Sequence, residues 1–168
     1  MLLRGDLYRV VSDADIEEIE RIYRLATEVR LKLPPYLEAG WLLHRKVYFP
    51  ECHEVAHAFA AVTGIEAVDG VCVVLTKTEQ TDDGSDFGAD FAAILHSWNE
   101  FSVPGAQRFI LDVLPEHGSS VLPVLLQAPH PAYLIPKDPK ACEALLQIQR
   151  PRLQRKIKNL IVAMRECI

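Results

Sequence analysis

The fold of this chain is decided by residues 91–114, which read FAAILHSWNEFSVPGAQRFILDVL. Two apolar runs, 91–98 and 108–114, flank the turn signal Val103-Pro104-Gly105. Proline and glycine in this position favour a reversal of the chain between two strands. The stretch therefore predicts a β-hairpin. It carries His96 on one arm and Asp112 on the other, near enough for a hydrogen bond between imidazole and carboxylate.

Further strand signals lie on both sides of this hairpin. Residues 68–76 are rich in Val, and shorter apolar runs follow at 121–126 and 132–135. The polar stretch 77–90 contains several aspartates and two glycines, which is typical of a loop between strands. Together these segments predict an antiparallel sheet of about four or five strands.

A helical pattern precedes the sheet. Ser12, followed by two aspartates, is typical of a helix N-cap, and apolar residues then recur at helical spacing as far as Leu33. Pro34-Pro35 should end this segment, because proline cannot donate to the hydrogen-bond ladder of a helix. We therefore expect a helix over 12–33.

Two more helical regions are expected. Pro50 and Gly64 delimit a short helix at 51–63, since proline favours the first turn and glycine the C-terminal cap. The C-terminal part predicts two helices, at 138–149 and 152–166, separated by Pro151. The order helices, sheet, helices defines an α+β class rather than an alternating α/β one.

Composition limits the class of protein. The 168 residues are 49% hydrophobic and 24% charged, which predicts one globular domain, 1–168. The predicted short helix and the strand segments place its core at 47–136. The net charge of -5 disfavours nucleic acid as a partner. No apolar window is long enough to span a membrane and the start has no signal-peptide core, so we expect no membrane partner and a cytoplasmic protein. The four cysteines lack a Cys-x-x-Cys pair, which excludes a zinc ribbon and suits a reducing compartment.

Cys52 is the first candidate for chemistry. It lies in the opening turn of the helix predicted at 51–63, where backbone N–H groups and the positive end of the helix dipole favour a thiolate. A thiolate nucleophile also needs a base and a group that orients the base. His96 and Asp112, on the two hairpin arms, are of the residue types that fill these roles.

Three motifs carry a resemblance to a known family. They are Phe49-Pro50-Glu51-Cys52 at a helix start, His96-Ser97-Trp98 on a strand, and Ile110-Leu111-Asp112-Val113-Leu114-Pro115 on the next. In this order they resemble the transglutaminase-like branch of the papain-like cysteine enzymes, over roughly residues 47–126. The resemblance implies a papain-like α+β core in which the Cys52 helix packs on an antiparallel sheet.

The resemblance also implies a function. Cys52 would be the nucleophile, His96 the base and later the acid, and Asp112 the orienting carboxylate. The reaction would be acyl transfer to an amine, or hydrolysis of a peptide or protein amide, without a cofactor. If the strand is regular, Trp98 shares a face with His96 and is a candidate wall of the substrate cleft.

A second hypothesis overlaps the first. Residues 53–57 read His53-Glu54-Val55-Ala56-His57, a motif that places two imidazoles on one helix face with a carboxylate between them. This pattern is typical of zinc-dependent peptidases, with Glu54 as the base and a third ligand sought among Glu66, Glu79, Asp86 and Asp90. It leaves the strands of His96 and Asp112 unexplained.

A third hypothesis is a non-enzymatic binding module on the same fold with an idle triad. A cysteine near a helix start is often a small buried apolar residue, and a histidine beside tryptophan is often a packed core residue. The basic residues of the last helix, Arg150, Arg152, Arg155, Lys156 and Lys158, are interpreted as a solvated face.

Overall fold

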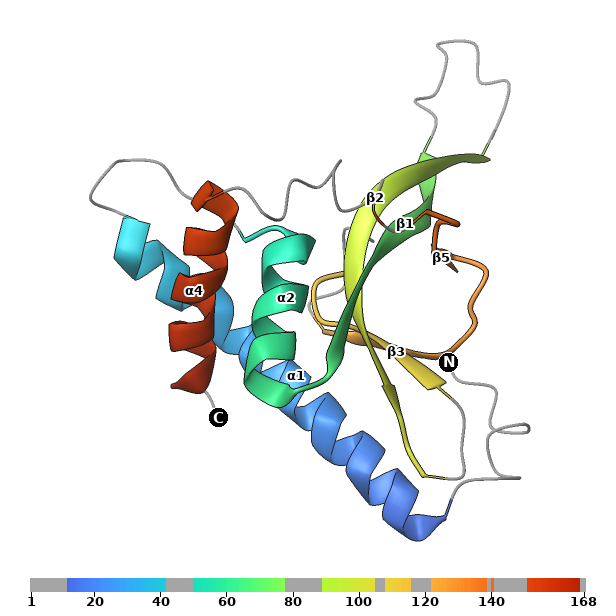
Figure 1. The fold of residues 1–168 in the computed structure, drawn as a ribbon, viewed down its shortest axis with the longest axis horizontal. Coiled ribbons are helices and arrows are strands. Elements are labelled where there is room, and N and C mark those ends of the chain that lie inside the picture. Colours follow the sequence, from blue (N-terminus) through green and yellow to red (C-terminus); the bar gives the residue numbers. More distant parts are fainter. Residues whose placement is uncertain are drawn as a thin grey trace.

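A computed structural model describes residues 12–41, 50–77, 89–104, 108–115, 122–138, 140 and 151–166. For 34–41, 75–77 and 89–90 it describes the backbone alone. This part of the chain has the predicted α+β architecture, with helices gathered on one side of a curled antiparallel sheet (Figure 1).

The described strands form one five-stranded sheet in the order β4-β3-β2-β1-β5, and all neighbours in it are antiparallel. Their bounds are β1 (Glu66–Lys77), β2 (Ala89–Ser102), β3 (Arg108–Asp112), β4 (Val124–Gln127) and β5 (Tyr133–Leu134). The predicted hairpin is confirmed, with Asn99 of β2 paired to Leu111 of β3. β2 continues to Ser102, beyond the predicted end, because its last residues are the ones that pair with β3.

Strand register decides which side chains share a face. Asp69 of β1 pairs with Ser97 of β2, and the next pair, Val68 with Trp98, points to the opposite side because successive side chains alternate. His96 pairs with Gly70, two residues from Trp98 along β2, and so shares a face with Trp98.

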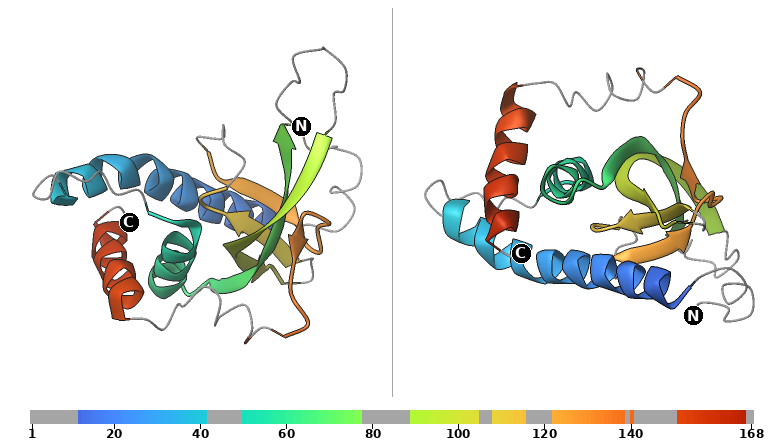
Figure 2. Two further views of the ribbon diagram at one scale, coloured as in Figure 1. Left: turned by 90° about the horizontal axis from the view of Figure 1, so that it is seen from above. Right: turned by 60° about the horizontal axis from the view of Figure 1, so that its bottom comes forward.

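The three described helices are α1 (Asp13–Trp41), α2 (Cys52–Thr63) and α4 (Pro151–Arg165). They gather on one side of the sheet, with α2 between the sheet and α4 (Figure 2). Ser97 faces this side, because its hydroxyl contacts His53 of α2. A single hydrophobic core joins the helices to the sheet, with buried members from α1 (Ile22, Ala26, Val29, Leu33), α2 (Val55, Ala58, Phe59), α4 (Ile157, Leu160, Met164) and the sheet side (Phe101, Val103, Phe109, Leu111, Val113).

One helix boundary differs from the prediction, and it involves two prolines. α1 does not end at Pro34-Pro35 but continues to Trp41: the fixed φ of proline is close to the helical value, so the backbone can continue, although each proline lacks an N–H for the hydrogen-bond ladder and its ring crowds the carbonyl four residues earlier. The helix predicted at 152–166 is α4, which begins one residue earlier, at Pro151, where a proline costs no helix hydrogen bond. The helix predicted at 138–149 lies almost entirely outside the described residues.

The ends of α2 follow the prediction closely. Glu51 is the N-cap, and it forms a capping box with Glu54. Gly64 ends the helix with φ +77°, a left-handed conformation that glycine adopts without strain. None of the described helices is both long and apolar enough to cross a membrane.

The opposite face of the sheet encloses a second, smaller core. Its buried members are Cys72, Trp98, Ile110 and Tyr133, and the rings of Trp98 and Tyr133 meet edge to face at 5.2 Å. Trp98 lies over Gly70, where a larger side chain would overlap its ring. The curl of the sheet therefore closes around Trp98.

Candidate functional site

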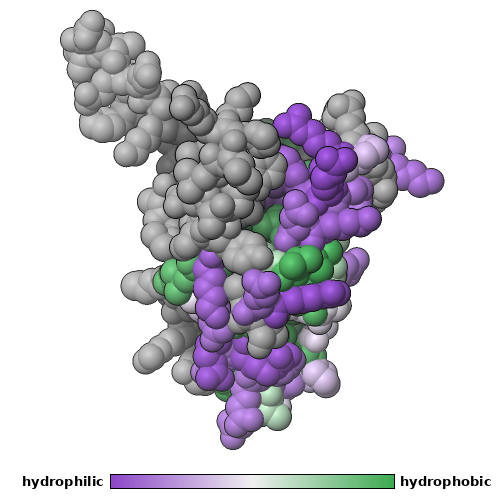
Figure 3. Space-filling view, turned by 90° about the vertical axis from the view of Figure 1, so that its left-hand side faces the viewer, coloured by the Kyte–Doolittle hydropathy of each residue, from purple (hydrophilic) through white to green (hydrophobic). Residues whose placement is uncertain are grey.

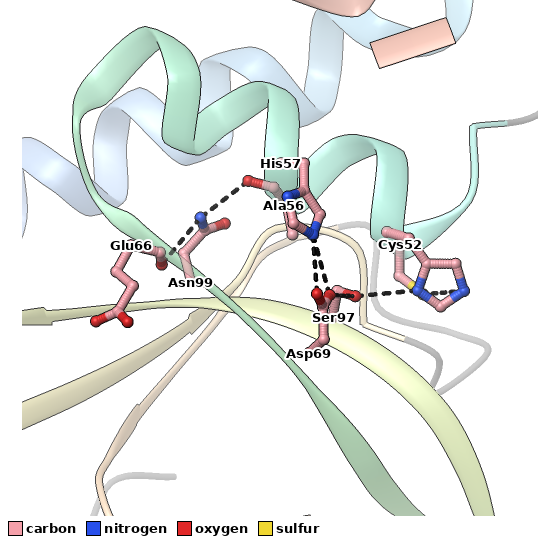
Figure 4. A network of polar contacts seen from close by, with 8 residues as sticks. Cys52, Ala56, His57, Glu66, Asp69, Ser97 and Asn99 are labelled. Carbon is pink, nitrogen blue, oxygen red and sulfur yellow. Dashed lines mark hydrogen bonds and ion pairs between the residues drawn. The ribbon is translucent and has the colours of Figure 1, made fainter. Parts of the chain in front are cut away.

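A network of polar side chains lies between the start of α2 and the sheet (Figure 4). Sγ of Cys52 is 3.4 Å from Nδ1 and 3.8 Å from Nε2 of His53. Nδ1 of His53 is in turn 3.0 Å from Oγ of Ser97, whose hydroxyl donates a hydrogen bond to Asp69. Helix and sheet thus bring a thiol, an imidazole, a hydroxyl and a carboxylate into one chain of contacts.

The contacts define how His53 is protonated. The Ser97 hydroxyl donates its hydrogen to Asp69, so its oxygen can only accept from the His53 ring. Nδ1–H of His53 is therefore the donor to Ser97. In the neutral ring this leaves Nε2 as the basic nitrogen, within reach of the Cys52 thiol.

Asp69 is the anionic end of this network. It also accepts from Nε2–H of His57, at 3.0 and 3.1 Å to its two oxygens. Burial acts to raise the pKa of Asp69, but the hydrogen bonds from His57 and Ser97 and the electrostatic interaction with the imidazoles of His57 and His53 outweigh it and hold the pKa below its ordinary value. Asp69 is therefore ionised at neutral pH, which orients both imidazoles.

α2 holds Cys52 at a defined place in this network. The amides of Cys52 and His53 lie in the first turn, so they have no acceptor four residues earlier in the helix. Asn99 of β2 donates to the carbonyl of Ala56 at 3.0 Å, which fixes α2 on the sheet. The Cys52 side chain is only 2% exposed, and neither Cys52 nor Cys72 forms a disulfide.

Glu54 points away from this network, toward α4. Its Oε1 forms an ion pair with Nζ of Lys156 at 2.7 Å, and its Oε2 accepts from the backbone of Glu51. The carboxylate of Glu54 therefore does not lie between His53 and His57, where the zinc hypothesis placed it, because it is buried against a different helix. The side of the molecule that carries α4 is mainly hydrophilic, as expected (Figure 3). Lys156 is an exception among the basic residues predicted to be solvated, because its side chain is only 15% exposed.

His53 and His57 both face the sheet, as the zinc hypothesis requires, but they contact Ser97 and Asp69 respectively. Among the residues that the structure describes, no group of three or more His, Cys, Asp or Glu side chains is arranged to hold a metal ion. Of the third ligands considered, Glu79 and Asp86 lie outside the described residues.

A second polar cluster lies on the other face of the sheet. Nε2–H of His96 donates to Oδ2 of Asp112 at 2.6 Å, which confirms the predicted contact between the hairpin arms. The hydroxyl of Tyr133 donates to the same oxygen at 2.7 Å. Burial, the negative charge of Asp112 and this hydrogen bond raise the pKa of Tyr133 far above its ordinary value, so that it stays a phenol.

The predicted contact between Cys52 and His96 is not made, because the two residues lie on opposite faces of the sheet. Ser97, beside His96 in β2, is the residue that faces α2. His96 instead stacks on Trp98, with ring centroids 6.3 Å apart, so these two share a face as expected for a regular strand. Trp98 is completely buried and is therefore not an exposed cleft wall.

Sequence reasoning missed four residues of these clusters: Asp69, Ser97, Tyr133 and Lys156. Asp69 carried a usable signal, since an aspartate inside a Val-rich strand needs a buried partner. Strand alternation would have placed Ser97 toward the helices, once the face of the sheet that they cover was known. Tyr133 and Lys156 offered no signal, because each meets its partner across a long separation in sequence.

No protein-family model, curated protein or solved structure matches this chain.

Proposed function

We propose that this chain is a cysteine enzyme that transfers or hydrolyses acyl groups, with Cys52 as nucleophile and His53 as base. The observation that carries the proposal is the unbroken series of contacts from the Cys52 thiol through His53 and Ser97 to Asp69. A nucleophile, a base and a carboxylate that orients the base are the parts such chemistry needs. His53 here replaces His96 of the sequence-based prediction.

In the proposed reaction, Nε2 of His53 accepts the thiol proton and Sγ of Cys52 attacks the carbonyl carbon of an amide. The electron pair of the C=O bond moves to oxygen, near the first-turn amides of α2. When the C–N bond breaks, His53 returns the proton to the leaving amine and a thioester remains. Water or a second amine attacks the thioester, His53 accepts its proton, and the Cys52 thiolate leaves and is reprotonated.

The substrate class and fold family belong to the same proposal. The motifs around Cys52, His96 and Asp112 are similar to those of transglutaminase-like enzymes. A papain-like core and a peptide or protein amide as substrate follow from that similarity. The chemistry also requires a reduced thiol, which suits a cytoplasmic location.

One observation favours a second candidate function, a non-enzymatic binding module. At 2% exposure, Cys52 is as buried as an ordinary core cysteine, and a substrate would have to open the site to reach it. In this alternative the polar network is a device that fixes α2 on the sheet.

Alkylation by iodoacetamide at pH 7 separates the two functions. Labelling is mapped by mass spectrometry and compared with the same chain in urea, with Cys72 as the internal reference for a buried thiol. We expect Cys52 to react faster in the folded protein than in urea, and p-nitrophenyl acetate to leave an acyl group that Cys52→Ser abolishes and Cys72→Ser retains. If Cys52 were labelled more slowly in the folded protein than in urea, and no acyl intermediate formed, the result would favour the binding module.

A further inference from the structure

A pocket of about 640 Å³ opens on the face of the sheet opposite Cys52. Its walls come from the ends of β2 and β3 and from the segment 128–135 that leads into and past β5. The volume is that of a small-molecule site. The pocket is independent of the proposed acyl-transfer site, because the sheet lies between them.

Most of the wall is aliphatic. The residues that supply it are Ile110, Pro129, Pro131, Leu134 and Ile135. Leu134 and Ile135 are exposed although they are large and apolar. A wall of this composition accommodates an apolar chain rather than a sugar or a nucleotide.

The polar groups of the pocket present hydrogen-bond donors. Glu100 is buried, and both its oxygens are engaged, one by the indole N–H of Trp98 at 2.9 Å and the other by Arg108. Arg108 is 54% exposed, and among the described residues its guanidinium is paired only with Glu100, so most of its five N–H groups remain for another acceptor.

His130 adds a second donor. Its Nδ1 accepts from the backbone N–H of Ala132 at 3.3 Å, so the neutral ring carries its hydrogen on Nε2. His130 also lines the pocket, edge to face with Tyr133. A guanidinium and an imidazole N–H beside an aliphatic wall are complementary to one anionic group attached to an apolar body.

From this arrangement we infer that the pocket binds a small aliphatic carboxylate, with its chain against Pro129, Leu134 and Ile135 and its carboxylate on Arg108 and His130. The guanidinium of Arg108 can bridge the carboxylate of the ligand and that of Glu100. Trp98 therefore reports binding, because its indole N–H is bonded to the same Glu100.

The test adds octanoate or its uncharged analogue octanamide to the full chain. Calorimetry measures the affinity of each probe, and NMR spectra record the indole N–H signal of Trp98. We expect octanoate to bind at least tenfold more tightly than octanamide and to shift the Trp98 signal. Equal binding of the two probes, or octanoate binding without a shift at Trp98, would overturn the assignment.

A matched pair of variants keeps the test independent of folding. Ile135 is 53% exposed at the pocket, so a charge there is tolerated by the fold. Both Ile135→Glu and Ile135→Lys remove the same apolar contact, but only the glutamate repels a carboxylate, so Ile135→Glu should bind octanoate at least tenfold more weakly than Ile135→Lys. Similar affinities in the two variants would contradict a carboxylate in this pocket. Arg108→Gln should also abolish the preference for octanoate over octanamide.

Discussion

His96 and Ser97 are adjacent in β2, yet their side chains belong to two polar clusters that the sheet separates. Ser97 faces α2 and joins Asp69 to His53, whereas His96 faces the smaller core around Trp98 and binds Asp112. This relationship follows from the alternation of side chains along a strand. It determines which histidine can act on Cys52, and it leads to the first prediction.

Replacing the two histidines should separate reactivity from stability. His53→Gln should slow acylation of Cys52 by about 100-fold, because a general base contributes on this order, with little change in the free energy of unfolding. His96→Gln should leave the acylation rate unchanged but lower the free energy of unfolding by about 2 kcal/mol, since buried Asp112 loses a charge-assisted hydrogen bond. Single-turnover acylation and urea unfolding measure the two effects. If a fully folded His96→Gln variant lost acylation, the result would instead support the triad of Cys52, His96 and Asp112 predicted from the sequence.

Lys156 should be the most sensitive lysine of α4. Lys156→Met leaves the carboxylate of Glu54 buried without its cation, and we expect the free energy of unfolding to fall by about 3–5 kcal/mol. Lys158→Met, at an exposed position of the same helix, should change it by no more than about 0.5 kcal/mol. Urea unfolding of both variants is the measurement, and equal effects would show that the ion pair between α2 and α4 is unimportant.

Asp69 should make stability depend on pH in the acid range. Its pKa in the folded protein lies below the ordinary value of 3.8, so the unfolded chain takes up a proton first as the pH falls. The stability that Asp69 contributes is complete above that value and is lost as the pH falls through the folded-state pKa.

Comparison with Asp69→Asn isolates this effect. The variant should be less stable than the parent chain at pH 6, and the difference should shrink as the pH is lowered from about 4 toward 2. Free energies of unfolding at several pH values give the difference directly. A gap that stays constant over this range would show that Asp69 is not held ionised by His57 and Ser97.

Gly70 should not accept a methyl group. A Cβ at this position would overlap the Trp98 ring and the backbone oxygen of Leu134. We expect Gly70→Ala to cost about 1–3 kcal/mol of unfolding free energy, as overpacking typically does. Gly64→Ala serves as the comparison, because it meets no atom and adds only the strain of a positive φ, about 1 kcal/mol. Thermal or urea unfolding ranks the two variants.

The sequence by itself determined the local elements and one contact of the site. The turn at Val103-Pro104-Gly105 and the flanking apolar runs specified the β2–β3 hairpin, and with it the hydrogen bond between His96 and Asp112. Gly64 likewise marked the end of α2. These features could be predicted because turns, caps and strand periodicity depend on neighbouring residues.

Only the tertiary structure decided which face of the sheet receives the Cys52 helix. β2 is buried on both faces from His96 to Phe101, so alternation separates His96 from Ser97 without saying which of them meets α2. The outcome depends on packing between distant segments: Phe59 of α2 joins the core formed by Phe101 and Leu111, while the other face curls around Trp98. Such complementarity of shape between surfaces far apart in sequence has no local signature.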